Sequence, residues 1–158
     1  IFPSMNADEL KVLDRMRVLC SRREYCRSDI FAKVLRSLEG DRAAAEDIVA
    51  SLEKDGYLSE LRYACAFARD KSAISGWGET KIRYMLASKG VPRDIVSRAL
   101  EEIDSSSADA RLVKLLENKY RSLKDDPQCR LKMLRFGLGR GYDYEKVDSV
   151  LKRIMLSD

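Results

Sequence analysis

The sequence repeats itself at a step of 52 residues, and this repeat restricts the possible folds more than any single motif. Three sets of large side chains recur at that step: Tyr25, Trp77 and Cys129; Ile30, Ile82 and Leu134; and Val34, Leu86 and Leu138. In each copy the second and third positions are four residues apart, which places them on one face of a helix. A period near 50 residues with helical spacing predicts a tandem array of small helical units.

A second helical pattern follows in each copy, at steps of 48 and 51 residues. Its members are pairs four residues apart: Ile48 and Leu52, Val96 and Leu100, and Val147 and Leu151. A unit of this size buries too little apolar surface to be stable alone, so the units should stack. No segment alternates apolar and polar residues as a strand does. We therefore predict an all-α fold of three tandem three-helix repeats, residues 7–58, 59–106 and 107–158, forming an elongated, curved array.

Residues that favour helix ends divide each repeat into three helices. The first helix is expected from Asp8 to Cys20, with its apolar residues at Leu10, Leu13, Met16 and Leu19. Later helix starts are marked by capping or first-turn residues: Asp41, Ser59, Gly78, Pro92, the Asp126–Pro127 pair and Asp143. Residues 104–107, Asp-Ser-Ser-Ser, are typical of a linker, and we expect the third repeat to begin near Ala108.

The composition indicates a soluble helical protein without a catalytic or metal centre. Hydrophobic residues make up 45% and charged residues 35% of the chain, and no apolar run approaches the roughly 18 residues that cross a bilayer. The sequence has no histidine, no glycine-rich phosphate loop and no nucleophile motif. Its four cysteines lack CxxC spacing and are predicted to be reduced, buried thiols of a cytoplasmic protein. We predict no enzymatic activity, no cofactor, no metal and no membrane association.

The net charge of +4 comes from the last repeat. Lys and Arg number 12 against 8 Asp and Glu in residues 107–158, whereas the first two repeats are nearly balanced. Between Arg111 and Arg140, nine basic residues accompany three acidic ones. Such a segment is a candidate footprint for phosphate groups or for an acidic protein face. The alternative is a helix face that is charged only because it is exposed to solvent.

Three stretches of the chain resemble the RecX family, the regulators of the RecA recombinase. They are Arg-Arg-Glu-Tyr at residues 22–25, Gly-Tyr-Leu-Ser-Glu-Leu-Arg-Tyr-Ala at 56–64, and Gly-Trp-Gly at 76–78 followed by Lys81-Ile82 and Lys89-Gly90-Val91. With the helical repeat, the resemblance covers about residues 10–156. Three positions depart from the family pattern: Cys26 stands where Ser is common, Ser59 where an acidic residue is common, and Glu79 where Pro is frequent. Cys26 is a poor helix cap, which leaves the start of its helix open.

The resemblance implies a regulator that binds the RecA nucleoprotein filament and inhibits its ATPase, strand-exchange and recombination activity, and so modulates DNA repair and the SOS response. One alternative is a helical nucleic-acid-binding module that makes phosphate contacts through its third repeat, with weak basic contacts to single- or double-stranded DNA. A third is a helical scaffold with an unrelated partner. We expect a monomer. The candidate interface with filament or DNA consists of ten basic residues: Arg22, Arg23, Lys71, Lys81, Arg83, Lys89, Arg130, Lys132, Arg135 and Arg140.

Aromatic residues near the motifs are interpreted as structural. Trp77 is equivalent to Tyr25 in the repeat, which favours a core position over a platform for stacking nucleic-acid bases. Tyr57, Leu58 and Tyr63 are predicted to pack the joint between the first two repeats. Lys81 and Arg83 neighbour a buried face without belonging to it, so their charges are expected to be exposed.

Overall fold

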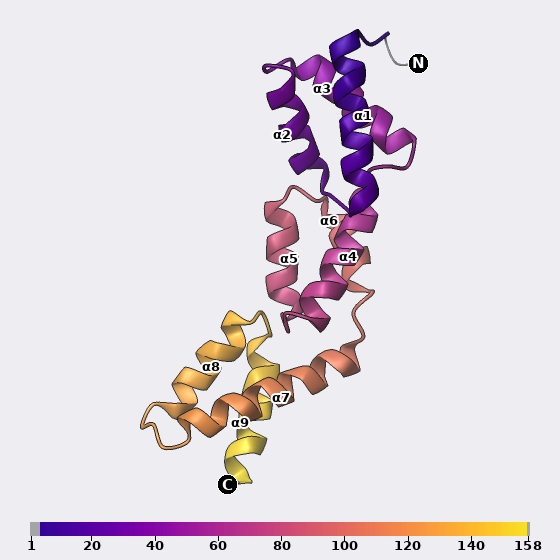
Figure 1. Cartoon of the computed structure of the whole chain (residues 1–158). Helices are drawn as coiled ribbons and strands as arrows, with labels where there is room; N and C mark the ends of the chain where they lie inside the picture. Colours follow the sequence, from indigo (N-terminus) through magenta and orange to yellow (C-terminus); the bar gives the residue numbers. More distant parts are fainter. Residues whose placement is uncertain (1–3, 158) are drawn as a thin grey trace.

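The computed structural model describes residues 4–157, and every regular element in this part of the chain is an α-helix (Figure 1). The helices are α1 (Ala7–Arg22), α2 (Arg27–Ser37), α3 (Arg42–Lys54), α4 (Glu60–Ala73), α5 (Glu79–Ser88), α6 (Arg93–Leu100), α7 (Ser105–Leu123), α8 (Cys129–Gly139) and α9 (Tyr144–Leu156). None of these helices is long and apolar enough to cross a bilayer. The all-α prediction is confirmed.

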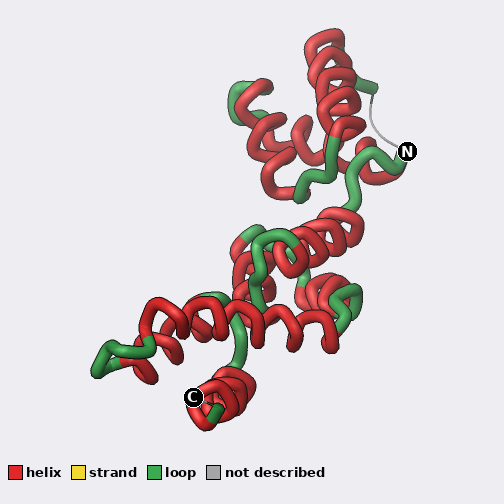
Figure 2. The backbone as a smooth tube through the Cα atoms, turned by 60° about the horizontal axis from the view of Figure 1, so that its bottom comes forward, coloured by secondary structure: helices red, strands yellow, loops and turns green. Residues whose placement is uncertain are grey.

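Three hydrophobic cores divide the helices into three consecutive units. Unit 1 packs α1, α2 and α3 together, unit 2 packs α4, α5 and α6, and unit 3 packs α7, α8 and α9. The units follow one another along an elongated body, with α1 at one end and α9 at the other (Figure 1). Helix α7 runs across this body, so unit 3 is turned relative to the other two (Figure 2). The array of three-helix units is confirmed, whereas the repeat boundaries at 58/59 and 106/107 stay a prediction.

The step of 52 residues holds between units 1 and 2 but is wrong for α8. The predicted apolar pairs of α2 and α5 are fully buried. In α8, Leu138 is 41% exposed and Leu134 is only half-buried, whereas Met133 and Gly137 are buried. The step from unit 2 to unit 3 is therefore 51 residues in α8, the same step that leads from Val96 to the buried Val147 of α9.

Gly137 explains this change of register, because it lets α8 lie directly against α9. A Cβ atom at Gly137 would lie 2.7 Å from Cγ1 and 2.8 Å from Cγ2 of Val147. Val147 is fully buried and its branched side chain has little rotational freedom, so it cannot move aside. Leu86 occupies the equivalent position in unit 2, where the middle helix presents a large side chain to the core.

Replacing Gly137 by leucine, the residue type at the equivalent position of unit 2, should therefore destabilise the protein. We expect the free energy of unfolding to fall by about 2–3 kcal/mol, the range found for overpacked cores, as measured by urea unfolding followed by circular dichroism. Gly139→Ala is the matched control, because a Cβ atom there meets nothing within 4 Å. It should leave stability unchanged or slightly higher. A Gly137→Leu variant as stable as wild type would contradict this account of the register.

Local hydrogen bonds confirm three of the predicted helix starts. Side-chain oxygens of Asp41, Ser59 and Asp143 accept hydrogen bonds from the backbone amides three residues further on, at 3.1, 3.2 and 2.9 Å. Pro92 is the N-cap of α6 and not its first helical residue. The Asp126–Pro127 pair lies in a turn before α8, whose N-cap is Gln128. A carboxylate oxygen of Asp126 accepts a hydrogen bond from the Gln128 amide at 2.8 Å, so it stabilises this turn.

The predicted linker at residues 104–107 is wrong, because this segment starts a helix. Asp104 is the N-cap of α7, and Ser105 is its first residue. The Asp104 carboxylate accepts hydrogen bonds from the hydroxyl of Ser107 at 2.8 Å and from the amide of Ser106 at 3.3 Å. These bonds hold the pKa of Asp104 below its usual range. Serine and aspartate are common both in loops and at helix starts, which is why the pattern was ambiguous.

The predicted apolar face of α1 is confirmed at Leu13 and Met16 but not at its two edges. Leu10 is 48% exposed, and Leu19 only packs against the edge of the core. The buried residues of α1 are Val12, Leu13, Met16 and Cys20. Met16 follows Val12 by four residues and Leu13 by three, and Cys20 follows Met16 by four, so the buried residues form one helical face in nearly the predicted direction.

Candidate partner-binding surface

The part of the chain between residues 4 and 157 contains no cluster of three or more cysteine, aspartate or glutamate side chains that could hold a metal ion. None of the four cysteines forms a disulfide; three are buried, and Cys65 is half-buried. Burial raises the pKa of each thiol, so these cysteines are held as neutral thiols. Their placement is that of packing residues.

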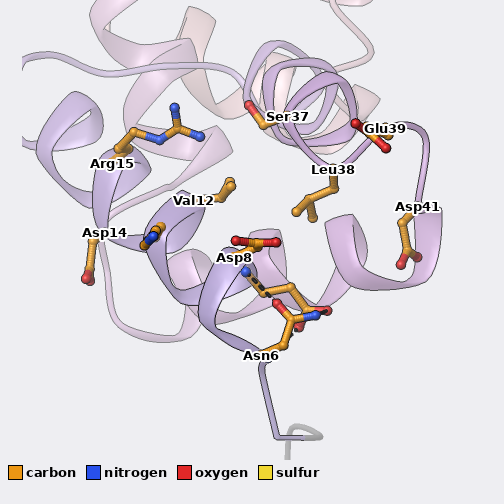
Figure 3. A pocket seen from close by; sticks show the side chains of 11 residues that line it. Asn6, Asp8, Val12, Asp14, Arg15, Ser37, Leu38, Glu39 and Asp41 are labelled. Carbon is orange, nitrogen blue, oxygen red and sulfur yellow. Dashed lines mark hydrogen bonds between the residues drawn. The ribbon is translucent and has the colours of Figure 1, made fainter.

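An open groove of about 710 Å³ lies at the end of unit 1, between the start of α1 and the turn that joins α2 to α3 (Figure 3). Several of its polar groups stabilise the helices around it. Asn6 and Glu9 form a capping box at the start of α1, and Asp41 caps α3. Asp14 forms an ion pair with Arg17 at 3.1 Å, and it lies at the opposite side of the groove from Asp41 (Figure 3). The carboxylates are thus spread around the rim and do not converge on a common point.

The joint between units 1 and 2 begins at the amino end of α2. Cys26 makes no capping hydrogen bond to this helix. Instead, the backbone amide of Arg27 donates a hydrogen bond of 2.6 Å to Oε1 of Glu60, the first residue of α4. A carboxylate from the next unit therefore caps α2 in place of the residue just before it. Burial raises the pKa of Glu60, and the bond from the Arg27 amide opposes this shift.

Contacts on either side of Glu60 complete the first joint. The hydroxyl of Ser28 donates to the carbonyl of Lys89 at 2.8 Å, and the Lys89 ammonium pairs with Asp29 at 3.3 Å. Tyr63 packs close by, and burial raises its pKa to about 12. Tyr57 was predicted to pack this joint, but it does not. It is exposed and stacks on Arg17 of α1, with 5.7 Å from the guanidinium carbon to the ring centre.

The joint between units 2 and 3 resembles the first joint, but its hydrogen bonds join backbone groups. The amide of Gly78, the N-cap of α5, donates to the carbonyl of Arg140 at 2.7 Å, and the amide of Thr80 donates to the carbonyl of Gly141 at 3.0 Å. Arg140 is 51 residues beyond Lys89, whose carbonyl accepts in the first joint. In both joints the amino end of a middle helix contacts the turn after the middle helix of the next unit.

Three side chains from unit 3 tie the second joint to α4 and the segment after it. Nη1 of Arg140 donates to the carbonyl of Ser75 at 3.1 Å, and the Tyr142 hydroxyl donates to the carbonyl of Gly76 at 3.1 Å. Nη2 of Arg111 donates to the hydroxyl of the buried Ser72 at 2.6 Å. In the sequence, Arg111 is recognisable only as the first residue of a basic segment. Its structural role comes from the contact with Ser72, which lies 39 residues earlier in the chain.

Trp77 lies at the same joint, with two lysine ammonium groups close to its ring. The Nζ atoms of Lys81 and Lys71 are 4.3 and 4.8 Å from the centre of its ring. The ring is half-buried and packs edge-on against Phe67, so Trp77 belongs to the border of the unit 2 core. Lys81 is also half-buried, because its Cβ lies against Gly141. It was expected to be an exposed charge, and the neighbouring unit covers it in part.

The ten predicted interface residues are distributed over all three units. Lys71, Lys81 and Arg140 gather at the second joint, and Lys89 lies at the first. Arg22 and Arg23 lie at the end of α1, and Arg83 pairs with Glu79 on α5. In unit 3, Arg130 pairs with Asp148 and Lys132 pairs with Asp126. Arg135 is exposed and has no ion-pair partner among the described residues.

Comparison with known proteins identifies the family. A model of the second three-helix domain of RecX matches residues 59–100, and a model of the third three-helix domain matches residues 108–151. The chain is 31% identical over 151 residues to the regulatory protein RecX of Prosthecochloris aestuarii, covering 95% of this chain and 97% of that protein. The chain belongs to the RecX family. It is also 31% identical to the regulatory protein RecX of Pseudomonas entomophila, over 84% of each chain.

Other RecX proteins are longer than this chain or more distant in sequence. The chain spans 60% of the length of the RecX protein of Clostridium perfringens strain 13, with 32% identity over 130 residues. A crystal structure of RecX from Lactobacillus salivarius superimposes with a TM-score of 0.82 at 21% identity, covering 94% of this chain and 97% of the other. This likeness shows a shared fold. The second joint described above therefore lies between the segments that match the second and third RecX domains.

Proposed function

We propose that this chain binds the RecA nucleoprotein filament and inhibits its ATPase, strand-exchange and recombination activity, and that it thereby modulates DNA repair and the SOS response. The relatives carry the name of a regulatory protein. The observation that carries the proposal is the stacked array itself, in which direct hydrogen bonds at both joints hold three units in a defined order. Such a body presents several surface patches at fixed spacing, as a ligand of a repetitive filament requires.

Action by binding, and not by catalysis, is the mechanism that these side chains support. In the unit 1 groove, Glu9 and Asp41 cap helices and Asp14 forms an ion pair, and the thiols are buried or half-buried. We further propose that the chain acts as a monomer in the cytoplasm, where its four free thiols remain reduced.

An ATPase assay of the cognate recombinase on single-stranded DNA tests this function. Addition of the protein should lower the ATPase rate at or below equimolar ratio to recombinase, and the protein alone should show no ATPase activity. Inhibition should weaken as salt rises, because part of the contact is between charged groups. Unchanged rates at a several-fold molar excess would refute the regulatory function.

Binding to nucleic acid is the second candidate, and the Trp77 site is the observation that favours it. A half-exposed indole with two ammonium groups at its ring is suited to hold a base and its phosphate. Titration of the protein against bare single-stranded DNA separates the two functions. Tight binding to bare DNA without inhibition of the ATPase would favour the nucleic-acid function.

A further inference from the structure

Helix α8 carries an apolar stripe that extends from the edge of its own core into solvent. Its buried residues are Cys129, Met133 and Gly137, which reflects the one-residue change of register. Leu131 and Leu138 are consequently turned outward and are 42% and 41% exposed. Leu134 lies between them in the sequence and is half-buried at the edge of the core, so the three leucines follow one side of the helix at spacings of three and four residues.

The charge around this stripe is of one sign. Arg135 lies on the same face as Leu131 and Leu138, is exposed, and has no ion-pair partner within residues 4–157. Helix α8 carries no acidic residue at all. The nearby carboxylates are already engaged, since Asp126 pairs with Lys132, and Asp148 pairs with both Arg130 and Lys152. The leucine stripe is therefore accompanied by one positive charge, that of Arg135, which no carboxylate of its unit pairs with.

We propose that this stripe of Leu131, Leu134 and Leu138, together with Arg135, is the surface through which unit 3 docks on an apolar patch of the recombinase filament that is rimmed by carboxylates. The proposal rests on the proposed function and names the chemistry of one contact within it. Exposed leucines on one helical face mark a protein interface, and nucleic acid offers little apolar surface to match them. Arginine at such a face pairs readily with carboxylates, in two-pronged geometry.

The same charge argues against a second copy of this chain as the occupant. Two α8 helices packed stripe to stripe would bring their unpaired Arg135 side chains together, with no acidic residue on either helix to compensate. Juxtaposed like charges disfavour such a pairing. A partner surface with carboxylates around an apolar centre is complementary both to the leucines and to Arg135.

The test compares leucine-to-glutamine variants on two different helices. The double variant Leu131→Gln/Leu138→Gln removes the exposed apolar surface while keeping good helix formers of similar size. Its affinity for recombinase filaments on single-stranded DNA with a nonhydrolysable nucleotide should fall about tenfold or more. Leu10→Gln is the control, because Leu10 is 48% exposed on α1 of unit 1; this variant should bind within about twofold of wild type.

Reversal of the Arg135 charge tests the electrostatic part of the proposal and does not depend on the leucines. Arg135→Glu should weaken filament binding several-fold at low salt, and the difference from wild type should shrink as salt rises. Arg15→Glu is the control, since Arg15 is an exposed arginine of α1 without an ion pair among the described residues. If the leucine double variant does not fold, as judged by circular dichroism, the Arg135→Glu pair carries the test.

The outcomes separate this inference from the proposed function. If wild type binds filaments and neither the leucine nor the Arg135 variant binds more weakly, the inference is wrong and the function stands. If sedimentation shows that wild type is a dimer and that the leucine variant is a monomer, the stripe is occupied by a second copy and the inference is wrong. If wild type does not bind filaments, the function and the inference fail together.

Discussion

Replacing Gly141 by alanine is expected to separate unit 3 from unit 2. Gly141 has a φ angle of +97°, which alanine rarely adopts, and its added Cβ atom would lie 2.3 Å from Cβ and 2.7 Å from the backbone nitrogen of Lys81. Backbone atoms of α5 cannot move aside, so the hydrogen bonds from Gly78 and Thr80 to this turn should break. Strain and clash together should lower the free energy of unfolding by about 2–5 kcal/mol.

Gly90→Ala is the matched control, because Gly90 lies in the equivalent turn of unit 2. Its φ angle is +78°, but a Cβ atom there meets nothing within 4 Å. In this variant the free energy of unfolding should fall by only about 1 kcal/mol, because backbone strain is the only cost. Urea unfolding gives the two stabilities, and small-angle X-ray scattering shows whether the overall dimensions change only in Gly141→Ala. Equal losses in both variants would mean that the close contact at Lys81 does not hold the joint together.

Binding should also depend strongly on assembly of the recombinase. We expect the chain to bind filaments on single-stranded DNA at least about a hundredfold more tightly than free recombinase subunits, because patches on several units can engage neighbouring subunits at once. Interferometry with recombinase in the presence and absence of DNA and a nonhydrolysable nucleotide measures both affinities. Equal affinity for the two forms would contradict contact through several units.

The Gly141→Ala and Gly90→Ala variants provide a further test of this second prediction. If the spacing of the units matters, Gly141→Ala should lose most of its preference for filaments while keeping its affinity for single subunits, and Gly90→Ala should keep both. This follows because avidity depends on whether two patches reach their sites at the same time. A Gly141→Ala variant that retains the full preference would show that one unit carries the binding.

The sequence was sufficient for the features of this fold that depend on neighbouring residues. Asp41, Ser59 and Asp143 cap helices through hydrogen bonds to amides three residues away, so their chemistry is visible in a short window. The buried faces of α2 and α5 follow from the four-residue spacing of apolar side chains. Periodicity near 50 residues then indicated that three helical units follow one another.

The tertiary structure decided what depends on residues far apart in the chain. The buried face of α8 is set by close packing of Gly137 against Val147 of the next helix, which spacing alone could not reveal. The helix start at Arg27 depends on a carboxylate 33 residues away, and the second joint depends on the meeting of Gly78 with Arg140. Which arginines are free for a partner was equally hidden, because ion pairs such as that of Arg130 with Asp148 form only when separate helices come together. Local hydrogen bonds and helical periodicity can be read from adjacent residues, whereas contacts between units arise from packing geometry that no short stretch of sequence encodes.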